Sequence, residues 1–206
     1  MKYNELLYAL RWRYYMWKTK FYWSHVFGSI GLRSTVCKPL LLQNPDKVFI
    51  GHHVRIREFA RIEAITDYNG KKYFPRIEIC DDTGFEQGLH MSCAKSIKIG
   101  KQVTVSAYVM IQDVTHGYEN IRKNILEQEL TIKPVEICEG CFIGLGARIL
   151  PGVKLGKHCI VGANSVVLEG SYMDYSVLVG NPAKYVKRYN VNKNIWQKTD
   201  INGHFI

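Results

Sequence analysis

A six-residue repeat between Ile137 and Val167 constrains this chain more than any other feature of its sequence. A branched aliphatic residue occupies every sixth position: Ile137, Ile143, Ile149, Leu155, Val161 and Val167. Four places after the first five of these lies a small or β-branched residue: Cys141, Ala147, Val153, Cys159 and Ser165. A period of six fits neither the 3.6-residue α-helix nor the two-residue alternation of a flat strand. Self-similarity at so short a period predicts a solenoid, and six residues per repeat indicate a β-helix.

These hexapeptides resemble those of the hexapeptide-repeat acyltransferases, a family that includes maltose, galactoside and xenobiotic acetyltransferases and other sugar O-acetyltransferases. The resemblance implies an all-β solenoid, a left-handed parallel β-helix in which three hexapeptides form one triangular coil. Residues eighteen apart then stack, so that Ile137 lies over Leu155 and Gly144 over Gly162. Both the aliphatic residue and the small residue four places later face the interior, and glycine occupies corners where a side chain would clash.

The repeat divides the chain into three parts. We expect residues 1–39 to form an N-terminal helical segment and a connector, and residues 40–182 to form the β-helix. Two stretches without the repeat, 66–76 and 117–134, should be loops that leave the solenoid, and such loops often carry binding chemistry. Asn69-Gly70 marks a tight turn in the first of them. Residues 183–206 are predicted to be a short C-terminal helix and tail.

Residues 1–27 contain ten of the chain's 25 aromatic residues. Apolar residues recur there at spacings of three and four, which predicts an amphipathic helix: Tyr3, Leu7, Leu10, Tyr14, Trp17 and Phe21. Four cations lie off this stripe: Arg11, Arg13, Lys18 and Lys20. Two interpretations remain open at this point. The helix makes peripheral contact with an anionic membrane, or it docks on the β-helix or on a neighbouring subunit.

The composition limits the partners and the compartment. The net charge is +10, but the basic residues are scattered, so we expect a basic solvated surface with a local cluster for a phosphate-rich ligand and no nucleic-acid partner. The six cysteines include the pair Cys138 and Cys141, but no second CxxC completes a zinc site. We therefore expect reduced core cysteines, no metal, and a cytoplasmic protein, either free or at the inner face of the membrane. Neither a signal peptide nor a transmembrane span is expected.

His116 is the candidate catalytic residue, because it lies where the repeat Ile111–His116 gives way to the second loop. An imidazole, with an ordinary pKa near neutrality, can take a proton from an attacking alcohol and return it to a departing thiolate. In the acyltransferases that this chain resembles, a histidine at this junction is the general base. Asp113 belongs to a similar Asp-x-x-His-Gly run of related polysaccharide acetyltransferases. Its carboxylate either fixes the imidazole tautomer or binds a sugar hydroxyl, or else it caps the turn.

The resemblance also implies the other site residues. On the acceptor side these are Glu86, where the family usually has asparagine, and Phe142, where it often has tryptophan. His90 lies in an irregular coil one stage before His116, so we expect it to line the same cleft as a substrate contact. On the cofactor side, coenzyme A would contact Gly144, Leu145, Gly162, Ala163, Asn164, Ser165, Lys184 and Lys187. Gly144 and Gly162 would leave a track free of side chains, and the N–H of Gly144 or Leu145 would hold the oxyanion. Glu169 is acidic where several relatives have a phosphate-facing lysine.

The function implied is an acetyl-CoA-dependent O-acetyltransferase. Its acceptor would be a carbohydrate hydroxyl on a capsule, O-antigen or exopolysaccharide precursor, carried as a free sugar, nucleotide-sugar or lipid-linked sugar. The resembling enzymes are homotrimers with active sites between subunits. One alternative is a non-catalytic β-helix that serves as a scaffold or sugar-binding subunit. A γ-class carbonic anhydrase is disfavoured, since the next histidine after His116 is His158.

Overall fold

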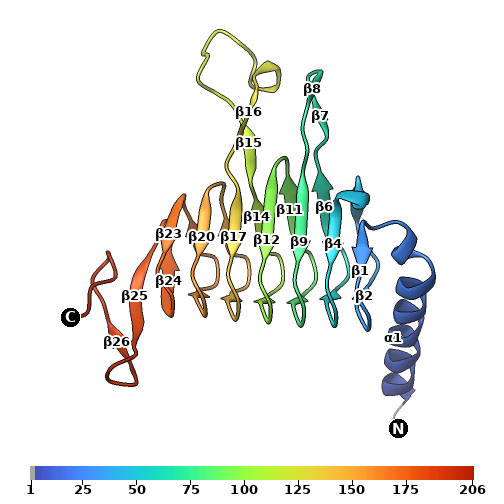
Figure 1. Cartoon of the computed structure of the whole chain (residues 1–206), viewed down its shortest axis with the longest axis horizontal. Coiled ribbons are helices and arrows are strands. Elements are labelled where there is room, and N and C mark those ends of the chain that lie inside the picture. The colour runs from blue at the N-terminus through green and yellow to red at the C-terminus, as the bar shows by residue number, and fades with distance from the viewer. Residues whose placement is uncertain (1–2) are drawn as a thin grey trace.

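The protein, described by a computed structural model over residues 3–206 with side chains from residue 5 onward, is a left-handed parallel β-helix (Figure 1). Its first face contains β1 (Ser29–Ile30), β4 (Val48–Ile50), β9 (Arg76–Ile79), β12 (Ser96–Ile99), β17 (Val135–Ile137), β20 (Val153–Leu155) and β23 (Gly170–Tyr172). The second contains β2 (Thr35–Val36), β5 (Arg55–Ile56), β10 (Gly84–Phe85), β13 (Thr104–Val105), β18 (Phe142–Ile143), β21 (Ile160–Val161) and β24 (Ser176–Gly180). The third contains β3 (Leu41–Gln43), β6 (Arg61–Ala64), β11 (His90–Cys93), β14 (Met110–Gln112), β19 (Arg148–Ile149) and β22 (Val166–Val167).

The core of the prism follows the predicted register. Ile137 pairs with Leu155, Ile143 with Val161 and Ile149 with Val167 on neighbouring parallel strands. All eleven positions predicted to face inward in this stretch are buried, at 0 or 1% exposure. The predicted fold class and the stacking of residues eighteen apart are therefore confirmed. Burial of one aliphatic side chain contributes roughly 1.5–3 kcal/mol, so a ladder of such positions is a large part of the stability.

Helix α1 (Tyr3–Phe21) lies across the N-terminal end of the prism (Figure 1). The buried side chain of Thr19 bonds the outermost strand β2: its Oγ1 accepts from the N–H of Val36 at 2.9 Å and lies 3.4 Å from the Val36 carbonyl. After the helix, a 3₁₀ turn (Trp23–His25) places Trp23 and Phe27 in the main core. An open strand edge invites unwanted pairing, and α1 covers this one.

The helix docks through a different face from the one that the sequence pattern singled out. Trp12 and Tyr15 are half-buried on the protein side with Thr19, whereas the predicted stripe from Leu7 to Phe21 is exposed. The side chain of Tyr3, its first member, lies outside the described residues. Docking on the β-helix, as one interpretation expected, is thus present but leaves the stripe uncovered. No helix of the described residues is both long and apolar enough to cross a bilayer.

Two excursions rise from the same side of the prism (Figure 1). The first is a hairpin of β7 (Asp67–Tyr68) and β8 (Lys71–Lys72), with Asn69-Gly70 at its turn. The second, which we call the arm, consists of β15 (Val114–His116) and β16 (Leu130–Ile132) with a 3₁₀ turn (Ile125–Glu127) between them. The Nδ2 of Asn69 donates to the carbonyl of Leu126 at 2.7 Å, so the two excursions support each other.

Two predicted boundaries differ from the structure. The first coil begins at Ser29, not residue 40, because β1 and β2 pair with β4 and β5, and a 3₁₀ turn (Pro45–Lys47) links β3 to β4. The predicted C-terminal helix is wrong. Residues 183–206 instead form β25 (Ala183–Asn190) and β26 (Ile195–Lys198), which extend the second face with antiparallel strands. β24 would otherwise be an open edge, and the alternating sequence of β25 can pair with it.

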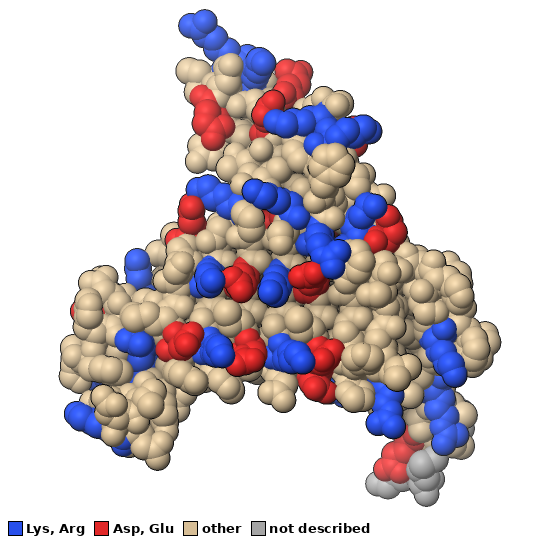
Figure 2. All heavy atoms as spheres, in the orientation of Figure 1, with Lys and Arg blue, Asp and Glu red and all other residues tan. Residues whose placement is uncertain are grey.

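The first face carries its charges in alternating rows (Figure 2). Glu78, Lys98, Glu136 and Lys154 follow one another across four neighbouring strands, and Lys154 lies 2.9 Å from Glu136. The basic residues on this face are therefore largely balanced. All six cysteines are free, and the hydrogen bond with Cys159, together with burial, raises the pKa of the Cys141 thiol. Within residues 3–206, no three His, Cys, Asp or Glu side chains converge as metal ligands would.

Candidate functional site

A polar pocket of about 310 Å3 lies on the third face, beneath the hairpin and the arm. Its floor consists of outward-facing side chains of three neighbouring strands, which the parallel register brings side by side: Arg61 and Glu63 of β6, His90 and Ser92 of β11, and Gln112 of β14. Tyr68 of the hairpin and His116 of the arm form its wall. The structure thus places His116 and His90, both predicted site residues, in the lining of one pocket.

The hydrogen bonds around His116 define which ring nitrogen is free. Nδ1 of His116 lies 3.2 Å from the hydroxyl of Tyr68, and that hydroxyl lies 2.7 Å from the carbonyl of Leu126. The carbonyl can only accept, so the single hydroxyl proton of Tyr68 is donated there. The Tyr68 oxygen must then accept from Nδ1–H of His116. This assigns the neutral tautomer that leaves the lone pair of Nε2 free.

The floor of the pocket is held by a charged network. Arg61 donates to both carboxylate oxygens of Glu63, at 2.7 and 2.8 Å, and Ser92 donates to Glu63 at 3.2 Å. The hydrogen bond from Arg61 lowers the pKa of Glu63 below its ordinary value, so this carboxylate is ionised at neutral pH. Burial, assisted by the charges of Arg61 and Arg148, lowers the pKa of His90, whose ring lies 3.3 Å from the Ser92 hydroxyl. The pocket therefore contains neutral imidazole and fixed polar groups.

Asp113 supports the turn below this pocket. Its carboxylate is fully buried and accepts from the backbone N–H groups of Ala94, Lys95 and Ser96 at 2.6–2.8 Å. Of the three predicted roles, these bonds resemble turn capping, but the turn that they hold lies in the preceding coil and is not the predicted turn into the arm. Among the described residues Tyr68, not Asp113, contacts the imidazole of His116.

The predicted cofactor residues lie together at another edge. The chain turns from the second face to the third at Gly144 and Leu145 in one coil and at residues 162–165 in the next. The N–H of Asn164 donates to the Leu145 carbonyl at 2.7 Å, so the two turns are stacked. Leu145, Ala163 and Asn164 are exposed at this corner. The sequence therefore predicted a cluster that the fold does form.

Three members of that cluster are already engaged within the protein. A Cβ on Gly144 would lie 2.7 Å from the backbone N of Ala163, so this glycine makes room for the next coil and not for a ligand track. Its N–H donates to the Val161 carbonyl at 2.8 Å and is not free for an oxyanion. A Cβ on Gly162 would touch Val179, and the buried Ser165 hydroxyl accepts from the Gly180 N–H at 3.1 Å. Among the described residues, Leu145 N–H and Ala163 N–H have no protein acceptor.

The remaining predicted residues lie outside these turns, and of them Lys184 pairs with Val179, which borders Gly162. Lys184 and Lys187 are exposed on β25. Glu169, which stands where a base was expected, forms an ion pair with Lys133 at the end of the arm. Phe142 lies in β18 on the second face, and Glu86 lies 3.6 Å from Arg57 in a different recess. A single chain therefore does not bring Phe142 and Glu86 together with His90, and their shared acceptor site stays a prediction for a site between subunits.

The turns at Gly144-Leu145 and at residues 162–165 form a corner that we call the predicted cofactor corner. His116 and this corner lie at opposite edges of the third face. His116 follows β14, where the chain leaves this face, whereas Leu145 precedes β19, where the chain enters it. One chain therefore does not bring His116 and this corner together. Sequence reasoning missed Arg61, Glu63, Ser92, Gln112 and Tyr68. The first four occupy outward positions stacked beside His90 and could have been found from the repeat register, but Tyr68 lies outside the repeat.

Comparisons with known proteins agree with this architecture. Residues 134–169 match the family described as bacterial transferase hexapeptide (six repeats), which confirms the predicted resemblance. WbbJ of Escherichia coli (strain K12), named as a lipopolysaccharide biosynthesis O-acetyl transferase, is 31% identical over 127 residues. That match covers 57% of this chain and 63% of WbbJ, less than two thirds of the relative's length.

Two kinds of solved structure share the fold. A point mutant of AntD, an N-acyltransferase from Bacillus cereus in complex with dTDP-4-amino-4,6-dideoxyglucose and coenzyme A, superposes with a TM-score of 0.70 at 18% identity. The alignment covers 85% of this chain and 91% of AntD. The hexapeptide-repeat acetyltransferase VCA0836 from Vibrio cholerae, complexed with acetyl coenzyme A, gives 0.52 at 21% identity, covering 91% and 78% of the two chains. At these identities the likeness extends to the fold alone.

Proposed function

We propose that this hexapeptide-repeat β-helix is an acetyl-CoA-dependent O-acetyltransferase that acts on a hydroxyl of a carbohydrate, with His116 as general base. The relative WbbJ supports the class of reaction, since it is named as an O-acetyl transferase, and VCA0836 shows that a protein of this fold can hold acetyl coenzyme A. The observation that carries the proposal is the pair Tyr68 and His116, which leaves a free imidazole lone pair at the wall of a polar pocket.

The proposed reaction requires one base and no covalent enzyme intermediate. As the acceptor oxygen attacks the thioester carbonyl, Nε2 of His116 takes its proton, and a C–O bond forms. When the C–S bond then breaks, the same proton passes from Nε2 to the departing thiolate sulfur. Tyr68 stabilises the imidazolium between these steps, because its oxygen accepts from Nδ1–H throughout. Tyr68 is a positioning residue in this scheme. Asp113 does not contact the imidazole, and its role is to stabilise the turn at Ala94–Ser96 below the pocket.

The acceptor is proposed to occupy the pocket on the third face. A sugar presents several hydroxyl groups, each of which can donate and accept, and the pocket offers both functions at Arg61, Glu63, His90, Ser92 and Gln112. This mixture suits a carbohydrate, because its hydroxyl groups can donate to the Glu63 carboxylate and accept from the Arg61 guanidinium. A precursor of a cell-surface polysaccharide is supported by the name of WbbJ.

The donor is proposed to bind at the corner of Leu145 and Ala163 in a second copy of the chain. The backbone N–H groups of these two residues have no acceptor within the described protein, as expected of groups that hold a carbonyl oxygen or a pantetheine amide. Lys184 and Lys187 supply exposed cations for the coenzyme phosphates. Because His116 and this corner lie at opposite edges of one face, a homotrimer in which each His116 meets the corner of a neighbour would complete three sites. The free cysteines support a cytoplasmic location.

The direct test is release of free thiol from acetyl-CoA with a panel of sugars, nucleotide-sugars and lipid-linked sugars. We expect turnover with at least one acceptor and loss of at least about a hundredfold in His116→Ala, the lower range for a general base. His204→Ala, on the exposed C-terminal tail, is the matched control and should retain full activity. Equal activity of His116→Ala and wild type would refute the base assignment. Sugar binding without turnover would favour a non-catalytic sugar-binding subunit.

A further inference from the structure

Helix α1 has two apolar faces, and the protein uses only one. Trp12, Tyr15 and Thr19 face the first coil. Away from this contact, five large side chains form a stripe and are each 47–59% exposed: Leu7, Leu10, Tyr14, Trp17 and Phe21. The last two also line a recess beside residues 30–34 of the first coil. Packing within this chain does not explain that stripe, because none of these side chains belongs to its core clusters. A contiguous apolar patch of this kind normally marks an interaction surface.

Cations border the stripe on both sides. Arg11 and Lys18, seven residues apart, lie along one border, and Arg13 and Lys20, also seven apart, lie along the other. Glu5 is the only acidic residue of the helix. Figure 2 shows basic side chains gathered over the region of α1. An apolar sector flanked on both borders by basic residues is the arrangement of helices that lie in a membrane interface.

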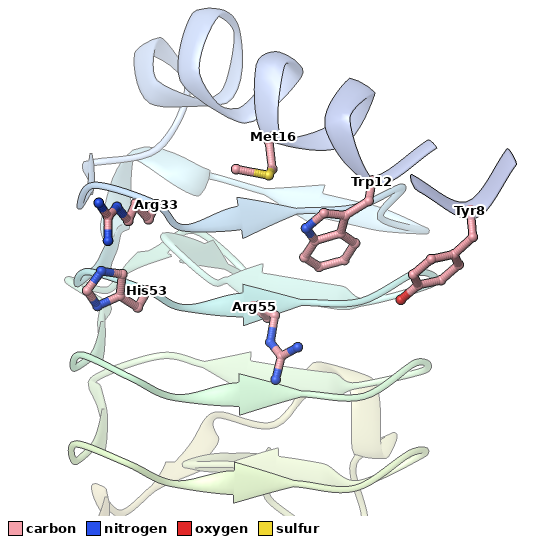
Figure 3. A pocket seen from close by; sticks show the side chains of 6 residues that line it. All are labelled: Tyr8, Trp12, Met16, Arg33, His53 and Arg55. Carbon is pink, nitrogen blue, oxygen red and sulfur yellow. The ribbon is translucent and has the colours of Figure 1, made fainter. Parts of the chain in front are cut away.

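A recess under the helix adds two more cations. Tyr8, Trp12 and Met16 of α1 point toward the first coils (Figure 3), and Arg33, His53 and Arg55 of these coils complete the lining of a pocket of about 390 Å3. His53 pairs with Asp82 at 3.2 Å. Neither Arg33 nor Arg55 has an acidic partner within residues 3–206, so both guanidinium groups are available to an anion from outside.

From these observations we propose that α1 docks the protein on an anionic lipid bilayer. The exposed stripe enters the boundary of the acyl chains, with Trp17 and Tyr14 at the depth where aromatic side chains prefer to lie. Arg13, Lys18 and Lys20 and the Arg33–Arg55 recess meet lipid phosphates, whereas Arg11 pairs with Glu58 at 3.0 Å. Charge complementarity selects this occupant over a second copy of the chain, because a copy would bring an identical set of cations against the first.

The position of α1 sets the orientation on the membrane. The helix crosses the N-terminal end of the prism, so the β-helix axis would point away from the bilayer (Figure 1). In the proposed trimer, on which this orientation rests, three copies assembled side by side would present all three helices at one end. Three weak contacts on one surface bind far more tightly than one.

The test is co-sedimentation of the full chain with two vesicle types, phosphatidylcholine alone and phosphatidylcholine with about one third phosphatidylglycerol, at low and high salt. We expect wild type to sediment with the anionic vesicles only, and less so at high salt. Leu10→Ser/Trp17→Ser should weaken partitioning about tenfold or more, and Arg13→Gln/Lys20→Gln about fivefold for each charge. The matched controls lie at the other end of the prism: Val191→Ser/Ile201→Ser and Lys193→Gln/Lys198→Gln.

The outcomes separate this proposal from the enzymatic one. Acetyl transfer to a soluble acceptor should be unchanged in all four variants, since none lies at the catalytic pocket. Failure of wild type to sediment with anionic vesicles, or equal sedimentation of the α1 variants and their controls, would overturn membrane docking. So would a change of oligomeric state in Leu10→Ser/Trp17→Ser with unchanged vesicle binding, because a second copy would then occupy the stripe.

Discussion

The phenol of Tyr68 and the imidazole of His116 are joined by a hydrogen bond of 3.2 Å, although the two residues lie 48 positions apart in the chain. The bond links the hairpin to the arm. The two ring centroids lie 5.5 Å apart. Because Tyr68 donates its own proton to Leu126, the bond has a defined direction, from Nδ1–H of His116 to the phenolic oxygen. The hairpin therefore determines which nitrogen of the arm histidine is basic.

Removal of this one oxygen should lower catalysis without disturbing the fold. In Tyr68→Phe the imidazole loses its acceptor, so we expect kcat to fall about tenfold, the value of one hydrogen bond, with little change in KM. Tyr73→Phe in the same hairpin region is the matched control, because the buried Tyr73 hydroxyl has no partner in the described structure. Thiol-release kinetics should separate the two variants. Identical kcat values would exclude the positioning role of Tyr68.

Substitution of Asp113 should affect stability more than chemistry. In wild type, three backbone N–H groups donate to the two carboxylate oxygens of Asp113. Asp113→Asn replaces one oxygen with an NH2 group, which cannot accept, so we expect a loss of about 2–4 kcal/mol in the free energy of unfolding. Asp174→Asn is the control. Asp174 is exposed and accepts from one backbone N–H, of Lys157, so its loss should be below about 1 kcal/mol. Urea unfolding measures both, and a kcat defect in folded Asp113→Asn without loss of stability would contradict the anchoring role.

His90 should make stability depend on pH. Burial and the cations Arg61 and Arg148 lower its pKa in the folded protein, whereas the unfolded chain protonates near the ordinary value of about 6.5. Below that pH the unfolded state binds more protons, so the free energy of unfolding falls until the folded pKa is passed. His90→Gln should flatten this decline between about pH 7 and pH 5, as measured by urea midpoints. The lowered pKa of Glu63 acts at more acidic pH with the same sign. An unchanged slope in His90→Gln would contradict the prediction.

The stability cost of a side chain at Gly144 can be compared with that at Gly84, where a Cβ would meet no neighbouring atom. Gly144→Ala places a Cβ against the backbone of the next coil, which cannot move without breaking the ladder, so we expect destabilisation of about 1–3 kcal/mol. In Gly84→Ala, in β10 of the second face, the added Cβ meets nothing within 4 Å, so the change should be neutral or stabilising by up to about 1 kcal/mol. Thermal unfolding distinguishes them. Equal melting temperatures would mean that the stacked coils yield at Gly144.

The repeat made part of this molecule predictable and left part of it open. In a solenoid the register of one aliphatic position determines the inward face and the stacked neighbour, so the core from Ile137 to Val167 followed from the sequence. The same register located His116 at the edge of a face. Tyr68 could not be found, because its contact depends on how two loops without a repeat lean together. The C-terminal strands were missed because pairing with β24 depends on a free edge that only the folded prism presents.

Complementation between inactive variants should reveal whether the site lies between chains. His116→Ala removes the base, and Ala163→Trp fills the exposed corner where the donor is proposed to bind. Each variant alone should be inactive. In trimers refolded from an equal mixture, an intact site needs His116 from one parent and Ala163 from the other, so about a quarter of the sites should recover. The mixture should stay inactive if folded variants are combined without subunit exchange. Its failure to recover activity after joint refolding would place base and donor corner in one chain, contrary to their positions at opposite edges of the third face.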